Sequence, residues 1–107
     1  MASPVTYCRD EDEVELLATI GKTEFEADDE SGFVVQAHVI DFLVSAADLV
    51  LGGERTLPQL GDRIKVAGES LTEVYEVRAI GGQGHYRFSD PHRTALRIHT
   101  SQVGTEQ

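Results

Sequence analysis

The sequence is poor in cysteine, in long apolar runs and in cations, and each shortage argues against a class of protein. Its single cysteine, Cys8, rules out an internal disulfide framework and fits a reducing cytosol. No apolar run approaches the roughly 20 residues that a membrane-spanning helix requires. The N-terminal stretch MASPVTYCRDEDEVE lacks the basic and apolar regions of a signal peptide. We therefore expect a chain without a signal peptide, a disulfide or a membrane partner.

The shortage of cations is the strongest compositional signal. Lysine and arginine number 9 against 19 acids, and the formal net charge is -10. Affinity for the phosphate backbone comes from cations that displace counterions, so the composition argues against a nucleic-acid-binding protein. The imbalance is uneven along the chain. Residues 1–30 are strongly acidic, whereas residues 77–107 hold more bases than acids, so the two ends could pair within one fold or between copies.

The pattern that is present is that of β-strands. Apolar and polar residues alternate with a period of two at residues 63–66, 74–79 and 96–99, which is typical of half-buried strands. The segment FVVQAHVIDFLVS is apolar on both parities, so both of its faces are covered or a bulge near Asp41 exchanges them. The alternation predicts a core of Val35, Val39, Ile64, Val66, Tyr75, Val77, Leu96 and Ile98.

Length and turn signals complete the predicted architecture. With 107 residues we expect one domain, 1–107, with residues 103–107 as a loose tail. Sequences rich in glycine and aspartate separate the strands, and SAADLVL allows one short helical turn with Ser45 as its N-cap. The predicted fold class is therefore all-β: a small antiparallel β-barrel or sandwich of five to seven strands with one long loop at about 45–61.

That long loop is a candidate functional element. It exceeds the usual length of a hairpin connection, and its middle combines an apolar stretch with a glycine pair. If the apolar residues are exposed, they dock on a neighbour; alternatively, Leu49 and Leu51 cap the end of the barrel. The residues assigned to this candidate contact are Leu49, Val50, Leu51, Gly52, Gly53, Glu54 and Arg55.

No pattern in the sequence predicts catalysis. The histidines His85, His92 and His99 recur every seven residues, which places successive members on opposite faces of a strand and argues against a metal site. The glycines of GGQG lack the lysine and the serine or threonine of a phosphate-binding loop. No G-x-S-x-G is present. We expect neither an enzyme nor a cofactor.

The basic segment 81–100 is the second candidate site. It carries Arg87, Arg93 and Arg97 against a single acid, Asp90, and arginine makes forked hydrogen bonds to carboxylates. We expect these residues to form an interface with carboxylates of another subunit. The alternative is pairing within the subunit, most economically with the acidic N-terminal block.

The chain also contains, in order, VTYCR, GKTEFEADDESG, DFLVSAADL, a P-x-x-G-D-x-I turn, VYEV and GGQGHYRFSDPHRTALRIHT. Their order and spacing resemble those of the small head–tail joining proteins of tailed phages and prophages, also called head-closure or stopper proteins. The resemblance extends from about Val5 to Val103, and its most specific segments are DFLVSAADL and SDPHRTALRIHT.

The resemblance implies a structural protein of the virion neck, assembled in the host cytoplasm. A homo-oligomeric ring of six such subunits would lie beneath the portal and adaptor, close the DNA-filled head and present a docking surface to the tail. It also implies that the long loop plugs the channel and that packaged double-stranded DNA passes through without specific binding. Two alternatives stay open: another neck or tail ring protein (an adaptor or tail terminator), or an OB-like barrel that binds nucleic acid through Tyr86, Arg87 and Phe88.

Overall fold

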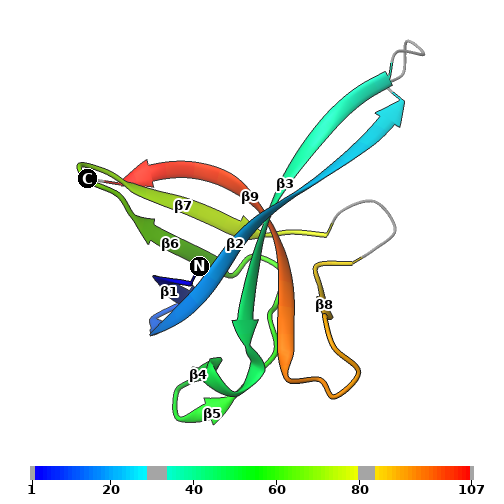
Figure 1. Ribbon diagram of the computed structural model, residues 1–107. Helices are drawn as coiled ribbons and strands as arrows, with labels where there is room; N and C mark the ends of the chain where they lie inside the picture. Colours follow the sequence, from blue (N-terminus) through cyan, green and yellow to red (C-terminus); the bar gives the residue numbers. More distant parts are fainter. Residues whose placement is uncertain (1, 29–33, 80–83, 107) are drawn as a thin grey trace.

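The computed structural model describes residues 2–28, 34–79 and 84–106, except for the side chains of residues 22–28 and 34–38. Six strands close an antiparallel barrel in the order β1–β2–β3–β9–β7–β6, with β6 pairing back to β1, and β8 adds a seventh strand beside β9 (Figure 1). This confirms the all-β prediction. The strands are β1 (Ser3–Arg9), β2 (Asp12–Asp28), β3 (Val34–Ser45), β4 (Val50–Leu51), β5 (Glu54–Arg55), β6 (Arg63–Ala67), β7 (Thr72–Val77), β8 (Tyr86–Phe88) and β9 (Ala95–Glu106).

The barrel interior follows the predicted alternation. Of the residues expected in the core, Val66 is only partly buried although it packs against the core, and the side chain of Val35 is outside the described part. In β7, both Val74 and Tyr75 are buried because the register with β9 shifts between them. The other predicted core residues are buried: Val39, Ile64, Tyr75, Val77, Leu96 and Ile98.

Strand β3 is covered on both faces. Its register with β2 and with β9 runs without a break through Asp41, which lies opposite Gly21 on one side and His99 on the other. Val39 and Asp41 on one face and Phe42 on the other are all buried. Coverage of both faces, rather than a bulge, therefore explains why this segment is apolar on both parities.

Beyond the barrel, β2 and β3 continue as a two-stranded ribbon (Figure 1). Strand β1 accompanies β2 only as far as Ala18, and β9 accompanies β3 only from Ile40 onward. The pairing of β2 with β3 nevertheless extends out to Asp28 and Val34. Asp28 is the last residue of β2, and residues 29–33 lie outside the described part of the chain.

The long loop and the C-terminus are more ordered than the sequence indicated. The loop contains a 3-10 turn, η1 (Ala46–Asp48), followed by the β4–β5 hairpin. The predicted helical turn is therefore present, but the Ser45 side chain makes no capping hydrogen bond. Residues 103–106, expected as a loose tail, continue β9, with Glu106 opposite Thr72 of β7. Backbone pairing with β7 holds them in place, while the one apolar side chain among them, Val103, is exposed. No helix in the described ranges is long and apolar enough to cross a membrane.

Candidate functional site

Arg97 is held inside its own subunit by a buried carboxylate. Its Nη2 and Nε lie 2.6 and 2.7 Å from Oδ2 of Asp41, whose side chain is completely buried. The other carboxylate oxygen lies 2.7 Å from Nδ1 of His99, which is equally buried. Arg97 therefore follows the intramolecular alternative, with a partner in β3 rather than in the acidic N-terminal block. The sequence could not reveal this pair, because Asp41 and Arg97 meet only through the pairing of β3 with β9.

Asp90 organises the turn between β8 and β9. Its carboxylate accepts hydrogen bonds from the Thr94 hydroxyl at 2.6 Å and from the amides of Thr94 and Ala95 at 2.9 Å each. These bonds, the Thr94 hydroxyl foremost, lower the pKa of Asp90 below its ordinary value. Within this turn Arg93 adopts a left-handed backbone conformation, with φ of 58°. The predicted interface acid thus has a local task, which is to fix the conformation that presents Arg93.

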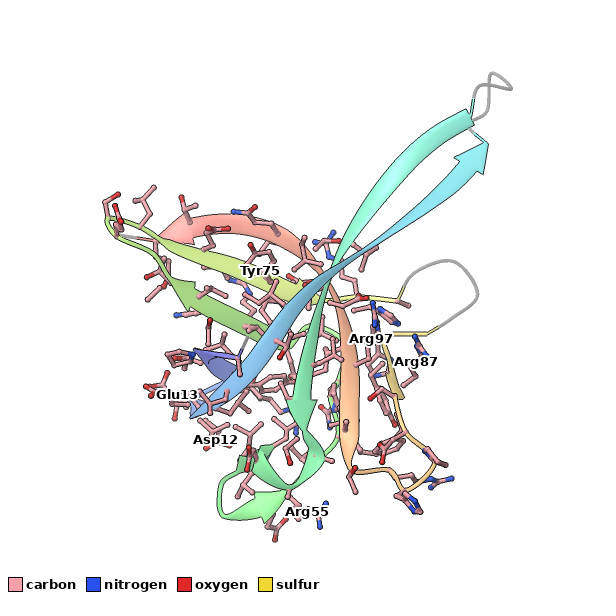
Figure 2. The ribbon with its side chains drawn as sticks, viewed as in Figure 1. Asp12, Glu13, Arg55, Tyr75, Arg87 and Arg97 are labelled. Atoms are coloured by element: carbon pink, nitrogen blue, oxygen red, sulfur yellow. The ribbon has the colours of Figure 1, made fainter. Side chains whose placement is uncertain are left out.

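Arg93 and Arg55 line one groove on the surface. The groove has a volume of about 580 Å³ and runs between the segment after β5 and the turn after β8. The guanidinium of Arg93 lies 5.6 Å from the centre of the Phe88 ring, a cation–π distance. Arg55 lies near the end of the barrel that carries the β4–β5 hairpin (Figure 2). The residues lining this arginine groove are Ala46, Arg55, Thr56, Leu57, Pro58, Gln59, Phe88 and Arg93.

Arg87 lies on the outer side of the sheet. It is the middle residue of β8, is exposed, and stands opposite Arg97 in the register with β9 (Figure 2). Its neighbours Tyr86 and Phe88 are partly buried and pack against the barrel core. Of the three predicted interface arginines, Arg87 and Arg93 therefore lie on the surface, whereas Arg97 is committed to Asp41.

The predicted gate loop packs against the barrel. Leu49 is fully buried and Leu51 is 7% exposed, so the premise that this apolar stretch is exposed is wrong for both. Val50 is partly buried. The turn between β4 and β5 consists of Gly52 and Gly53, whose φ values of 60° and 83° belong to the left-handed region. Hairpin turns of this type require such values, so the glycine pair shapes a tight turn. The two strand residues beyond it, Glu54 and Arg55, are exposed.

A network around Asp62 was missed by sequence reasoning. Its buried carboxylate accepts hydrogen bonds from the Tyr7 hydroxyl, the Arg9 guanidinium and the backbone amide of Gln59. Burial, followed by the bond to Asp62, raises the pKa of Tyr7. The hydrogen bond to Asp62 likewise raises the pKa of Arg9. The P-x-x-G-D turn is the sequence signal for this network, because its aspartate, Asp62, directly precedes β6. Strand β6 pairs with β1, which carries Arg9.

The three histidines of segment 81–100 lie in separate places and do not form a common site. His99 is buried beside Asp41, and Nε2 of His85 lies 2.9 Å from the carbonyl oxygen of Pro58. His92 is exposed in the turn after β8. In the described part of the chain, no three His, Cys, Asp or Glu residues are grouped as metal ligands.

Comparison with known proteins identifies the family. The model of the phage head-tail joining protein family matches the chain over residues 1–107. Neither the curated proteins nor the solved structures gave a significant match. The family match covers the whole barrel, including the arginine groove and the two turns whose backbone amides bind Asp62 and Asp90. The chain therefore belongs to the phage head-tail joining protein family.

Proposed function

We propose that this protein forms a ring in the virion neck, beneath the portal or adaptor, that closes the DNA-filled head and gives the tail its docking surface. The observation that carries the proposal is the family match over residues 1–107. A compact barrel with unpaired surface arginines supports it, because ring formation needs complementary surfaces on one subunit. Six copies are the number that the sequence resemblance implies.

The charge of the protein suits a DNA channel. Each subunit carries a formal charge of -10, so a ring of subunits surrounds its axis with carboxylates. A lumen of this sign repels the phosphate backbone and lets DNA slide without adhering. The same charge makes subunits repel one another, so local contacts between opposite charges must offset that repulsion.

The alternatives fit the structure less well. An OB-like nucleic-acid site needs aromatic rings that are free to stack on bases beside a basic groove. Here Tyr86 and Phe88 are partly buried against the core, and the Phe88 ring already faces the Arg93 guanidinium, so neither ring is fully free to stack on a base. An adaptor or tail terminator would contain clear amphipathic helices, whereas the described residues form only the short turn η1 as helical structure.

The test is to image particles produced without this protein by negative staining. We expect DNA-filled heads that lack tails and leak DNA, and we expect purified protein to restore tail attachment. Normal tailed particles would contradict the proposal. Heads that lose their packaged DNA and whose portal carries no adaptor ring would instead indicate that this protein is the adaptor. Tails of abnormal length on intact heads would indicate a tail terminator.

A further inference from the structure

The arginine groove holds cations that have no acidic partner in their own subunit. In the described part of the chain, neither Arg55 nor Arg93 forms an ion pair or a hydrogen bond with a carboxylate. Between them lie the apolar surfaces of Phe88, Pro58 and Leu57, and Leu57 is 45% exposed. Two arginines above an apolar floor form a site for carboxylates, because the floor excludes water from the ion pairs.

The opposite charge is concentrated in the turn between β1 and β2. Asp10, Glu11, Asp12 and Glu13 are consecutive, and all four are exposed. None of them has a hydrogen bond or ion pair with another described side chain. The turn is narrow, since Arg9 and Asp12 are directly paired and only two residues connect them. Its shape and charge suit insertion into a shallow groove.

The acidic turn and the groove are separate surfaces that both adjoin the β4–β5 hairpin, since a Cβ on Gly52 would come within 3.7 Å of Oδ2 of Asp12 and Arg55 lines the groove. Figure 2 shows Asp12 and Glu13 beside the end of β2, on the side of the barrel away from β8 and Arg87. The groove is bounded by the β8 turn and by the segment that follows Arg55. Among the described residues the two surfaces form no ion pair with each other, so both are available to another copy. Two different complementary surfaces on one subunit produce head-to-tail association, which closes into a ring when the rotation permits.

We propose that the acidic turn Asp10–Glu13 of one copy docks into the arginine groove of the next copy, where Arg55 and Arg93 bind its carboxylates. This pairing rests on the proposed ring function and names the two surfaces that build the ring. In this proposal Arg55, rather than Arg97, acts together with Arg93 in binding the carboxylates, because Arg97 is already bound to Asp41. The contact places opposite charges together where two subunits of charge -10 would otherwise repel.

The test is a charge exchange between two variants. The groove variant is Arg55→Glu/Arg93→Glu, and the turn variant is Glu11→Arg/Asp12→Arg. Each alone brings like charges together, so self-association measured by sedimentation velocity should weaken at least tenfold. In an equimolar mixture each reversed surface meets a complementary one, so association should recover. Arg63→Glu/Arg78→Glu and Glu69→Arg/Glu106→Arg are controls with the same changes of net charge at other exposed positions and should associate as the unmodified protein does.

A parallel assay on purified tailless heads separates this proposal from the proposed function. If the heads bind the unmodified protein and both variants equally, the proposed neck function stands and the proposed contact between the acidic turn and the groove is contradicted. A mixture that associates no better than either variant, with normal melting curves throughout, would also overturn it. Heads that refuse the unmodified protein would overturn the neck function, and sedimentation in solution would then decide the pairing. An unmodified protein that is monomeric in solution and on heads contradicts both.

Discussion

Among single residues, Asp41 determines what the C-terminal arginines can do. Its carboxylate is buried in the middle of β3 and is satisfied by Arg97 on one oxygen and His99 on the other. A buried carboxylate is tolerated only while its partners remain, because desolvation of the charge is costly. The ring nitrogen Nε2 of His99 is buried without a hydrogen-bond partner, which adds to the cost of this cluster. The fold therefore uses Arg97 to hold Asp41, whereas Arg87 and Arg93 are exposed on the surface.

Removal of Arg97 should destabilise the subunit rather than only its assembly. We expect Arg97→Ala to lower the free energy of unfolding by about 3–5 kcal/mol, since the charge of Asp41 loses its cation. Urea denaturation measures this directly. The exposed Arg78 is the matched control, and Arg78→Ala should change stability by no more than about 0.5 kcal/mol. Equal stabilities for the two variants would mean that Arg97 does not hold Asp41.

Protonation of Asp90 should loosen the turn that presents Arg93. The pKa of Asp90 in the folded protein lies below its ordinary value, chiefly because the Thr94 hydroxyl donates to the charged carboxylate. A carboxyl group with a lowered pKa stabilises the fold at any pH above its unfolded pKa, and this stabilisation is lost as the pH falls through the folded pKa. The turn should therefore persist at neutral pH and loosen only at a pH below the ordinary pKa of an aspartate. Amide NMR signals of Thr94 and Ala95 report it, and Asp90→Asn should remove their dependence on acid. A transition above pH 5 would contradict this assignment.

Among the elements, the β4–β5 hairpin acts as a cap on one end of the barrel. Leu51 of the hairpin and Leu49 just before it belong to the buried core cluster, and the amide of Thr56 donates to the carbonyl of Leu49 at 3.0 Å, which ties the hairpin closed at its base. The turn also lies close to β2, since a Cβ on Gly52 would come within 3.7 Å of Oδ2 of Asp12. These contacts favour capping over gating for this segment.

The capping role predicts a large effect of shortening Leu49. Leu49→Ala should cost about 2–5 kcal/mol, because it leaves a cavity at a fully buried site. Leu60→Ala is the matched control, since Leu60 is 62% exposed and its loss should cost about 0.5 kcal/mol or less. Thermal melting followed by circular dichroism compares the two. A mild effect of Leu49→Ala would return the loop to the gating hypothesis.

Deletion of residues 50–56 tests the same element as a whole. If the hairpin caps the barrel, the shortened protein should melt early and fail to join heads, because Leu51 and the bond to Leu49 are lost. A shortened protein that folds and assembles but releases DNA prematurely would instead establish a gate. Melting curves and DNA retention by reconstituted heads distinguish these outcomes.

The strands were predictable from the sequence, and the way the chain brings distant residues together was not. Alternation located β6, β7 and the start of β9, because buried core residues recur there at every second position, as Tyr75 and Val77 or Leu96 and Ile98 do. The short strands β4 and β5 lack enough residues for a period to appear. Burial of Leu49 and the pairing of Arg97 with Asp41 depend on contacts between segments far apart in the chain, which no local pattern encodes. The surface arginines were found from charge alone, and their groove required the fold.

For the whole molecule, the net charge makes a further prediction. With a formal charge of -10, the protein should not bind DNA at physiological salt, although it surrounds DNA in the proposed neck. Gel filtration with and without single-stranded DNA should give the same elution volume. Residual binding to positions near Arg87 would be removed by Arg87→Ala. A DNA-dependent shift that this substitution abolishes would favour the OB-like alternative, because the nucleic-acid site of that alternative includes Arg87.

The last strand of the chain completes the barrel, and this has a consequence for synthesis. Strand β9 pairs with β3, β7 and β8, so residues 95–106 join three elements at once. Until the ribosome releases this segment, β3 and β7 keep open edges and the core cannot close. A chain truncated before Ala95 is therefore expected to misfold or aggregate rather than yield a smaller subunit. The barrel therefore closes only when residues 95–106 are free to pair, so this segment decides whether a nascent chain becomes a folded subunit.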